Sequence, residues 1–247
     1  LVQPQSRESA QSIVPAGHYM NMKTGEDLGD TVIFVPFMRH KKRILWQTIE
    51  DGGGILCHSF DAIMGTLHGD CATCRNEETG VRRQDFGPGK NGATPECTVY
   101  MDYPSIILPD VAVDDQGIVQ LEGEMGEDPV GVLSFSKTSL PVSRTIMRIV
   151  QSNKRKIFAN VFAVTSKYNE GAGTSWYTSE CEWVGWVSAE LYAMISEELE
   201  TLLQAFGSPE AYSPEAIAAA EDTTAETAAE EESGESAEAA ADDDLPF

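Results

Sequence analysis

The sequence lacks the features that would place it in a membrane or in a common enzyme class. No apolar run approaches the ~20 residues that a membrane-spanning helix requires, and no secretory signal leads the chain, so we expect a cytoplasmic protein without a membrane partner. A glycine-rich phosphate loop, a nucleophile–base motif and a helical carboxylate–histidine pair are also missing. Asp102 and the acids between 110 and 128 remain candidates for a nuclease metal site, but their spacing is typical of loops. The sequence therefore favours a binding protein over an enzyme.

Basic residues are scarce and unevenly placed. The chain has 17 Lys and Arg against 40 Asp and Glu, for a net charge of −23. Residues 208–247 hold thirteen of the acids and no base, whereas residues 131–167 hold seven bases and no acid, and residues 39–43 hold four bases. This segregation predicts a basic groove for nucleic acid on an otherwise acidic surface. The alternative is that each basic block is a solvated face without a partner.

Cysteine is also infrequent, yet four of the five cysteines fall within 41 positions. Cys57, Cys71, Cys74 and Cys97 form the pattern C-x13-C-x2-C-x22-C, which predicts one tetrahedral Zn²⁺ site. The site has no evident open position, so we expect structural zinc that stabilises the element-poor segment 51–98.

Three other residues bear on this metal site. His58 and His68 are alternatives for one ligand position, and the absence of any metal is a further alternative. Cys181 alternates in phase with Tyr177, Trp183 and Val187, so we expect it to lie in the core rather than to bind metal.

The hydrophobic pattern predicts a mainly β protein with two helices. Strands are expected at 31–37, 42–49, 98–101, 105–108, 117–121, 130–136, 157–167 and 175–187, with a hairpin loop at 168–174. One helix opens at 139–141. A second, capped by Ser188, carries an apolar stripe of Leu191, Ile195, Leu199, Leu202, Leu203 and Phe206.

These elements suit an α+β chain built on an OB-like barrel with a zinc-stapled insertion. We expect a flexible arm at 1–29, a DNA-binding domain at 30–207 with its zinc subdomain at 51–98, and a disordered acidic tail at 208–247.

The tail ends in a tip of different composition. Phe247 joins an aromatic ring to the terminal carboxylate, which favours capture by an apolar pocket beside a basic residue. The alternative is a plain solubilising tail. The predicted partner-binding residues are Asp242, Asp243, Asp244, Leu245, Pro246 and Phe247.

Single-stranded nucleic acid is bound by cations that follow the phosphates and by aromatic rings that stack on bases. Each aromatic candidate except Tyr168, which falls on the predicted loop, is also a candidate for the core. The predicted DNA-contacting residues are Arg39, Lys41, Lys42, Arg43, Trp46, Phe135, Lys137, Arg144, Arg148, Lys154, Arg155, Lys156, Lys167, Tyr168 and Trp176.

Two parts of the sequence resemble known families. The ending at 242–247 resembles the tip of bacterial single-stranded DNA-binding proteins. The cysteine insertion, with Trp46 upstream, resembles that of phage-encoded DNA-binding proteins. This resemblance of the body covers roughly residues 30–205. A zinc subdomain inside an OB barrel is similar to the helix-destabilising protein of T-even phages, which has a different ligand set.

The resemblance implies a protein that protects single-stranded DNA in viral replication, recombination and repair in the host bacterial cytoplasm. It also implies that the tail recruits replication and recombination proteins and competes with DNA for the groove. The alternative is a zinc-ribbon transcription or recombination factor that binds duplex DNA or RNA polymerase.

Overall fold

The structure is a computed structural model that describes part of the chain. The described residues are 14–21, 24–47, 53–87, 94–126, 129–171 and 174–196. The predicted tail and its tip lie outside them. No helix in these ranges is long and apolar enough to cross a membrane.

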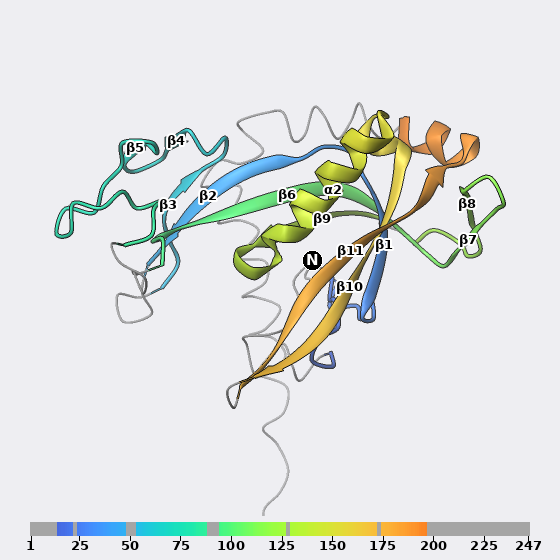
Figure 1. Cartoon of the computed structure of the whole chain (residues 1–247), viewed down its shortest axis with the longest axis horizontal. Coiled ribbons are helices and arrows are strands. Elements are labelled where there is room, and N and C mark those ends of the chain that lie inside the picture. The colour runs from blue at the N-terminus through green and yellow to red at the C-terminus, as the bar shows by residue number, and fades with distance from the viewer. Residues whose placement is uncertain are drawn as a thin grey trace, which may run out of the picture. The chain divides into compact units, whose positions relative to one another are not determined.

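The long strand β6 (Cys97–Leu108) organises the sheet (Figure 1). It unites the two strands predicted at 98–101 and 105–108. One edge of β6 pairs with β2 (His40–Trp46) along its first half and with β1 (Thr31–Pro36) along its last residues. Between the two ladders the chain from β1 to β2 has three residues, 37–39, whereas β6 has two, 103–104. The extra residue bends the chain between β1 and β2, as at a β-bulge.

Pro104 explains where this bend falls. Its carbonyl accepts a hydrogen bond from the Phe37 N–H at 2.8 Å, so this edge of Pro104 faces the bend. Proline has no N–H to donate to this edge, so a ladder hydrogen bond would be missing at Pro104 wherever the chain bent. The interruption therefore costs little at the point where β1 gives way to β2.

The remaining strands extend this framework into one nine-stranded sheet with the order β3-β2-β6-β1-β10-β11-β8-β7, and β9 pairs with the other edge of β6. They are β3 (Ile55–Ser59), β7 (Val111–Val113), β8 (Ile118–Leu121), β9 (Val130–Ser136), β10 (Asn160–Gly171) and β11 (Thr174–Val187). The β8–β11 pairing is parallel and the other ladders are antiparallel. The prediction of a mainly β, α+β chain is confirmed, and the sheet is open and mixed.

Two apolar clusters cover opposite faces of the sheet centre. Neighbouring residues of a strand point to opposite faces, and Phe34 and Phe162 belong to one cluster while Val35 and Val161 belong to the other. All four side chains are fully buried. The centre of the sheet is therefore buried on both sides.

Helix α2 (Leu140–Asn153) packs through Val142 and Ile146 on the cluster that contains Phe34 and Phe162, which we call the α2 cluster. Pro141 lies in its first turn, where a missing N–H costs nothing, as the sequence predicts. The second predicted helix is helical over 189–196. There the Ser188 hydroxyl accepts the Leu191 N–H at 3.2 Å, so the predicted cap is confirmed. Its predicted residues Leu199, Leu202, Leu203 and Phe206 lie outside the described part.

The expectation of a flexible arm at 1–29 is wrong for the described residues of that segment. Val14, Tyr19 and Met20 are buried, and the Tyr19 hydroxyl donates a hydrogen bond to Ser179 at 2.9 Å. Gly17 lies against the ring of Tyr177, with no room for a side chain. A few apolar residues without periodicity are enough to fix this segment, because the β10–β11 hairpin provides the surface that they cover.

The β10–β11 hairpin corrects a second prediction. Of the predicted loop at 168–174, residues 168–171 and 174 are strand, in a ladder paired from Asn160↔Trp186 through Gly171↔Thr174. A bulge between Val161 and Phe162 places Trp183 and Trp186 on the same face, where their rings meet edge to face at 4.9 Å between centroids. Strict alternation predicts a core position for Trp183, whereas this side chain is exposed.

Candidate metal site and nucleic-acid interface

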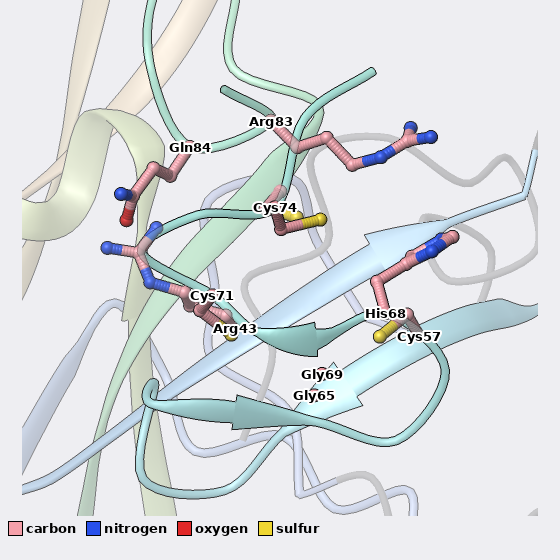
Figure 2. A pocket seen from close by; sticks show the side chains of 10 residues that line it. Arg43, Cys57, Gly65, His68, Gly69, Cys71, Cys74, Arg83 and Gln84 are labelled. Atoms are coloured by element: carbon pink, nitrogen blue, oxygen red, sulfur yellow. The ribbon is translucent and has the colours of Figure 1, made fainter. Parts of the chain in front are cut away.

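The four predicted zinc ligands line one pocket (Figure 2). Cys57 lies on β3 and Cys97 at the start of β6, and both pair with Leu45 of the intervening strand β2. Cys71 and Cys74 follow the short hairpin of β4 (Met64–Gly65) and β5 (Gly69–Asp70). We call residues 53–87 together with Cys97 the cysteine module. Its cysteines thus converge from two sheet strands and one turn.

Asp70 holds the Cys-x-x-Cys turn in shape. Its side chain accepts the Ala72 N–H at 2.8 Å, and its carbonyl accepts the Cys74 N–H at 3.0 Å. An Asx turn of this kind reverses the chain within four residues. Cys71 and Cys74 are therefore presented from one turn, as the spacing predicts.

One backbone donor and one side-chain donor approach the sulfur of Cys57. The Leu67 N–H lies 3.4 Å from Cys57 Sγ, and the Thr66 hydroxyl lies 3.9 Å from it. A side chain at Gly65 would come within 2.9 Å of Cys57 Sγ and 3.8 Å of Cys71 Sγ, so glycine leaves room for both sulfurs. Hydrogen bonds to sulfur favour the thiolate, which is the form that binds metal.

Without a metal ion the thiols oppose one another's ionisation. Burial, followed by the neighbouring Cys74, Cys57 and Cys71, raises the pKa of Cys97 to about 11. Burial also raises the pKa of Cys74. A bound divalent cation would reverse this preference, because it stabilises the thiolates that repel one another in its absence.

The donor set suits zinc, although the side chains are not arranged around an ion. Among the described residues, no three His, Cys, Asp or Glu side chains are positioned to hold a metal as they stand. Of the two histidine alternatives, His68 lines the pocket. His58 follows Cys57 on β3 and so points to the other face, where it is buried edge-on against Phe60 at 5.1 Å.

The first basic block is divided between the two faces of β2. Lys42 forms an ion pair with buried Asp102 at 2.6 Å, and Arg43 lines the cysteine pocket. Arg39 and Lys41 are exposed. The block is therefore not a single phosphate-binding strip, because alternate residues of a strand serve different sites.

An aromatic pair of exposed Trp46 and half-buried Tyr100 lies beside Lys42. The Trp46 indole N–H donates to the Tyr100 hydroxyl at 3.1 Å, and the Lys42 ammonium lies 5.5 Å from the centre of the Tyr100 ring. Trp46 is 44% exposed. Sequence reasoning missed Tyr100, because its partners come from a strand more than fifty positions away. Met101, the next residue of β6, packs against the α2 cluster, so Tyr100 points to the other face of the sheet. The Trp46–Tyr100 pair therefore occupies the face away from the α2 cluster.

The second basic block surrounds α2 and faces solvent. Arg155 lies over the Trp186 ring at 4.0 Å. The exposed members of this block are Lys137, Arg144, Arg148, Lys154, Arg155 and Lys156. These side chains are available to a charged partner.

The predicted hairpin contacts lie on different faces. Tyr168 is 54% exposed and meets Tyr177 edge to face at 5.5 Å between ring centroids. Lys167 and Trp176 lie on the opposite face, where Lys167 pairs with Glu180 at 2.7 Å. Tyr168 is thus on a strand and not on a loop, although it is exposed as predicted.

Phe135 is a wrong prediction as a DNA contact. It is 3% exposed and packs against Tyr103 with 5.7 Å between ring centroids. It alternates with Ser134 and Ser136 on β9, and the inward face of that strand belongs to the core. One apolar residue flanked by polar ones predicts burial more directly than it predicts stacking.

Cys181 and Asp102 lie outside the cysteine pocket. Cys181 packs against the α2 cluster, and burial raises its pKa to about 12. Asp102, the acid considered for a nuclease site, is buried and accepts hydrogen bonds from Lys42 and from the Ser134 hydroxyl at 2.5 Å. Its oxygens are engaged within the sheet.

A comparison with protein families bears on the second half of the domain. Residues 115–205 are similar to a family of phage proteins. The family is described as Pam3 phage gp34-like protein, and the matched segment runs from β8 through β9, α2, β10 and β11. The similarity supports a phage origin. No curated protein and no solved structure matches the chain significantly.

Proposed function

We propose that this chain is a non-enzymatic phage protein that binds single-stranded DNA without sequence preference during replication, recombination and repair. The observation that carries the proposal is the order of pairing in the sheet. We number the bent strand formed by β1 and β2 as strand 1, and β6, β9, β10 and β11 as strands 2 to 5. Strand 1 pairs with strands 2 and 4, strand 2 pairs with strand 3, and strand 4 pairs with strand 5. Helix α2 lies between strands 3 and 4 in the sequence.

This order supports an OB-like fold, because in OB folds strand 1 contacts strands 2 and 4 and a helix separates strands 3 and 4. OB folds bind oligonucleotides on the face of strands 2 and 3 and with the loops that join strands 1–2 and 4–5. The described ladders do not include a pairing of β9 with β11 that would close the barrel. The proposal therefore concerns an OB-like sheet that is open on this side.

Several side chains support the corresponding surface. The cysteine module occupies the connection between strands 1 and 2, and the β10–β11 hairpin corresponds to the connection between strands 4 and 5. Trp46 and Tyr100 are placed to stack on bases, and on the hairpin Trp176 and Tyr168 offer one exposed aromatic ring on each face. The exposed cations around α2 would follow phosphates as a bound strand leaves this face.

We propose that the cysteine module holds structural Zn²⁺ through Cys57, Cys71, Cys74 and Cys97, with His68 as the alternative to one cysteine. Bound zinc would join β3, β6 and the Cys-x-x-Cys turn. The tail tip, 242–247, is proposed to recruit replication and recombination proteins, and the acidic tail to compete with DNA for the basic surface.

The second candidate is a zinc-ribbon factor that binds duplex DNA, which is favoured by the Cys-x-x-Cys turn next to exposed basic residues. Competition between a single strand and a duplex of equal length separates the two candidates. A preference for the duplex would support the second.

Titration of tryptophan fluorescence with a homopolymer single strand tests the main proposal. Binding is expected to quench Trp46 and Trp176 and to weaken with salt at a log–log slope of about −0.7 per phosphate neutralised. Replacing Arg144 and Arg148 together by Gln is expected to reduce that slope by the share of about two phosphates. An affinity that does not change with salt would contradict the electrostatic part of the proposal.

A further inference from the structure

Two arginines share the pocket of the four cysteines (Figure 2). Arg83 pairs with Glu96 through Nη1, but its Nε is buried without a hydrogen-bond partner. Arg43 has two such atoms, Nε and Nη1. The pocket therefore contains buried cationic donors that protein oxygen atoms do not satisfy.

A buried guanidinium needs an opposing charge. Arginine remains charged in proteins, so it cannot relieve its burial by losing a proton. An unpaired buried charge is strongly unfavourable. Glu96 already pairs with Arg83, and the described residues that line this pocket include no aspartate and no glutamate, so for Arg43 the cysteines are the available source of negative charge.

The charge on the cysteines depends on their chemical state. Free thiols and disulfides are neutral and would leave Arg43 uncompensated. Four thiolates around one Zn²⁺ carry a net charge of about −2, and a set in which His68 replaces one cysteine carries about −1. Either centre is anionic and would supply negative charge in the pocket that these N–H groups line.

We infer that Arg43, assisted by Arg83, balances the charge of a metal–thiolate centre and thereby sets its affinity for zinc. This inference rests on the metal site proposed above. It makes Arg43 a positioning residue of that centre and removes it from the DNA-contacting set, although it belongs to the first basic block. Outer-shell partners of metal ligands typically contribute 10- to 100-fold to metal affinity.

Arg43→Gln tests the inference, with Arg82→Gln as a matched control. Arg82 belongs to the same module, but it is exposed and its Nε pairs with Asp85 at 2.6 Å. Zinc affinity is measured on the full chain by competition with a chromophoric chelator, together with the absorption spectrum after Co²⁺ substitution. Arg43→Gln is expected to weaken zinc binding by about 10- to 100-fold. Arg82→Gln should match the wild type.

Two further variants keep the test decisive. Arg43→Lys retains the charge but not the fork of donors and should recover part of the affinity, whereas Arg83→Gln should give a smaller loss than Arg43→Gln. If Arg43→Gln does not fold, as judged by circular dichroism, these two variants still give the comparison. Unchanged zinc affinity in Arg43→Gln or in Arg83→Gln would overturn the inference.

Failure of the metal-site proposal and failure of the DNA-binding proposal would give different experimental results. A wild-type chain that takes up neither Zn²⁺ nor Co²⁺ would overturn the metal site and this inference together. DNA titration of the same samples tests the nucleic-acid proposal independently. Normal DNA binding in zinc-loaded Arg43→Gln is expected, because Arg43 faces the cysteines and not the Trp46–Tyr100 face.

Discussion

Large apolar side chains are buried in the centre of the sheet and exposed in the cysteine module. Phe34, Tyr103 and Phe162 are fully buried, whereas Met64 is 58% exposed and Phe86 70% exposed. Most hydrogen bonds within the module close turns, such as those accepted by Asp61 and Asp70. Turns of this kind set the path of the chain but bury little apolar surface.

The contrast indicates that the two regions depend on different sources of stability. The sheet centre has apolar clusters on both faces and can be stabilised by burial alone. The module has neither cluster and is tethered to the sheet through β3 and Cys97. Its order should therefore depend on metal, while that of the sheet should not.

The largest expected effect comes from removing ligands. Replacing Cys71 and Cys74 together by Ser should abolish zinc binding and remove folding free energy on the order of 10 kcal/mol from the module. Hydrogen exchange resolved by peptide should show loss of protection at residues 53–87 and preserved protection in β10. Cys181→Ser, outside the pocket, serves as the control for zinc content. Loss of protection throughout the sheet would show that the regions are not independent.

A core substitution should produce the opposite pattern. Phe162→Ala removes a fully buried ring from the α2 cluster and should destabilise the sheet by about 3–5 kcal/mol in urea unfolding. Zinc content of the folded protein should stay at the wild-type level. Loss of zinc from the folded variant would contradict the separation between the regions.

The smallest expected effect concerns the boundary between the regions, where Trp46 ends β2. Trp46→Ala should weaken single-strand binding by about 1–3 kcal/mol, the contribution of one stacked base. Phe86→Ala is the matched control, because Phe86 is also an exposed aromatic residue but belongs to neither strand of the β2–β6 ladder. Equal losses in the two variants would argue against a specific role of the Trp46–Tyr100 face.

Local patterns accounted for much of the fold. The β-branched run at 31–37 and the alternation at 130–136 correspond to β1 and β9, and Pro141 and Ser188 mark the two helix starts. The cysteine spacing was sufficient to predict that four thiols share one pocket. Such signals survive without tertiary information because turn chemistry, capping and periodicity act within a few residues.

Other predictions failed where distant strands decide the outcome. Phe135 is buried because β9 turns it toward α2, and Tyr19 is buried because the β10–β11 hairpin lies above it. Tyr100 became a candidate contact through Trp46. The bulge opposite Val161 placed Val187 on the other face from Cys181, which alternation along one strand cannot reveal.

The sequence by itself determined the strand-rich class, the helix starts, the charge segregation and the cysteine cluster, since each depends on residue type and short spacing. Tertiary structure decided which face each side chain occupies. It paired Lys42 with Asp102 and turned Arg43, the next residue, toward the cysteines. The physical reason is that a strand sends successive side chains to opposite faces, and the strands packed against each face decide what those side chains meet.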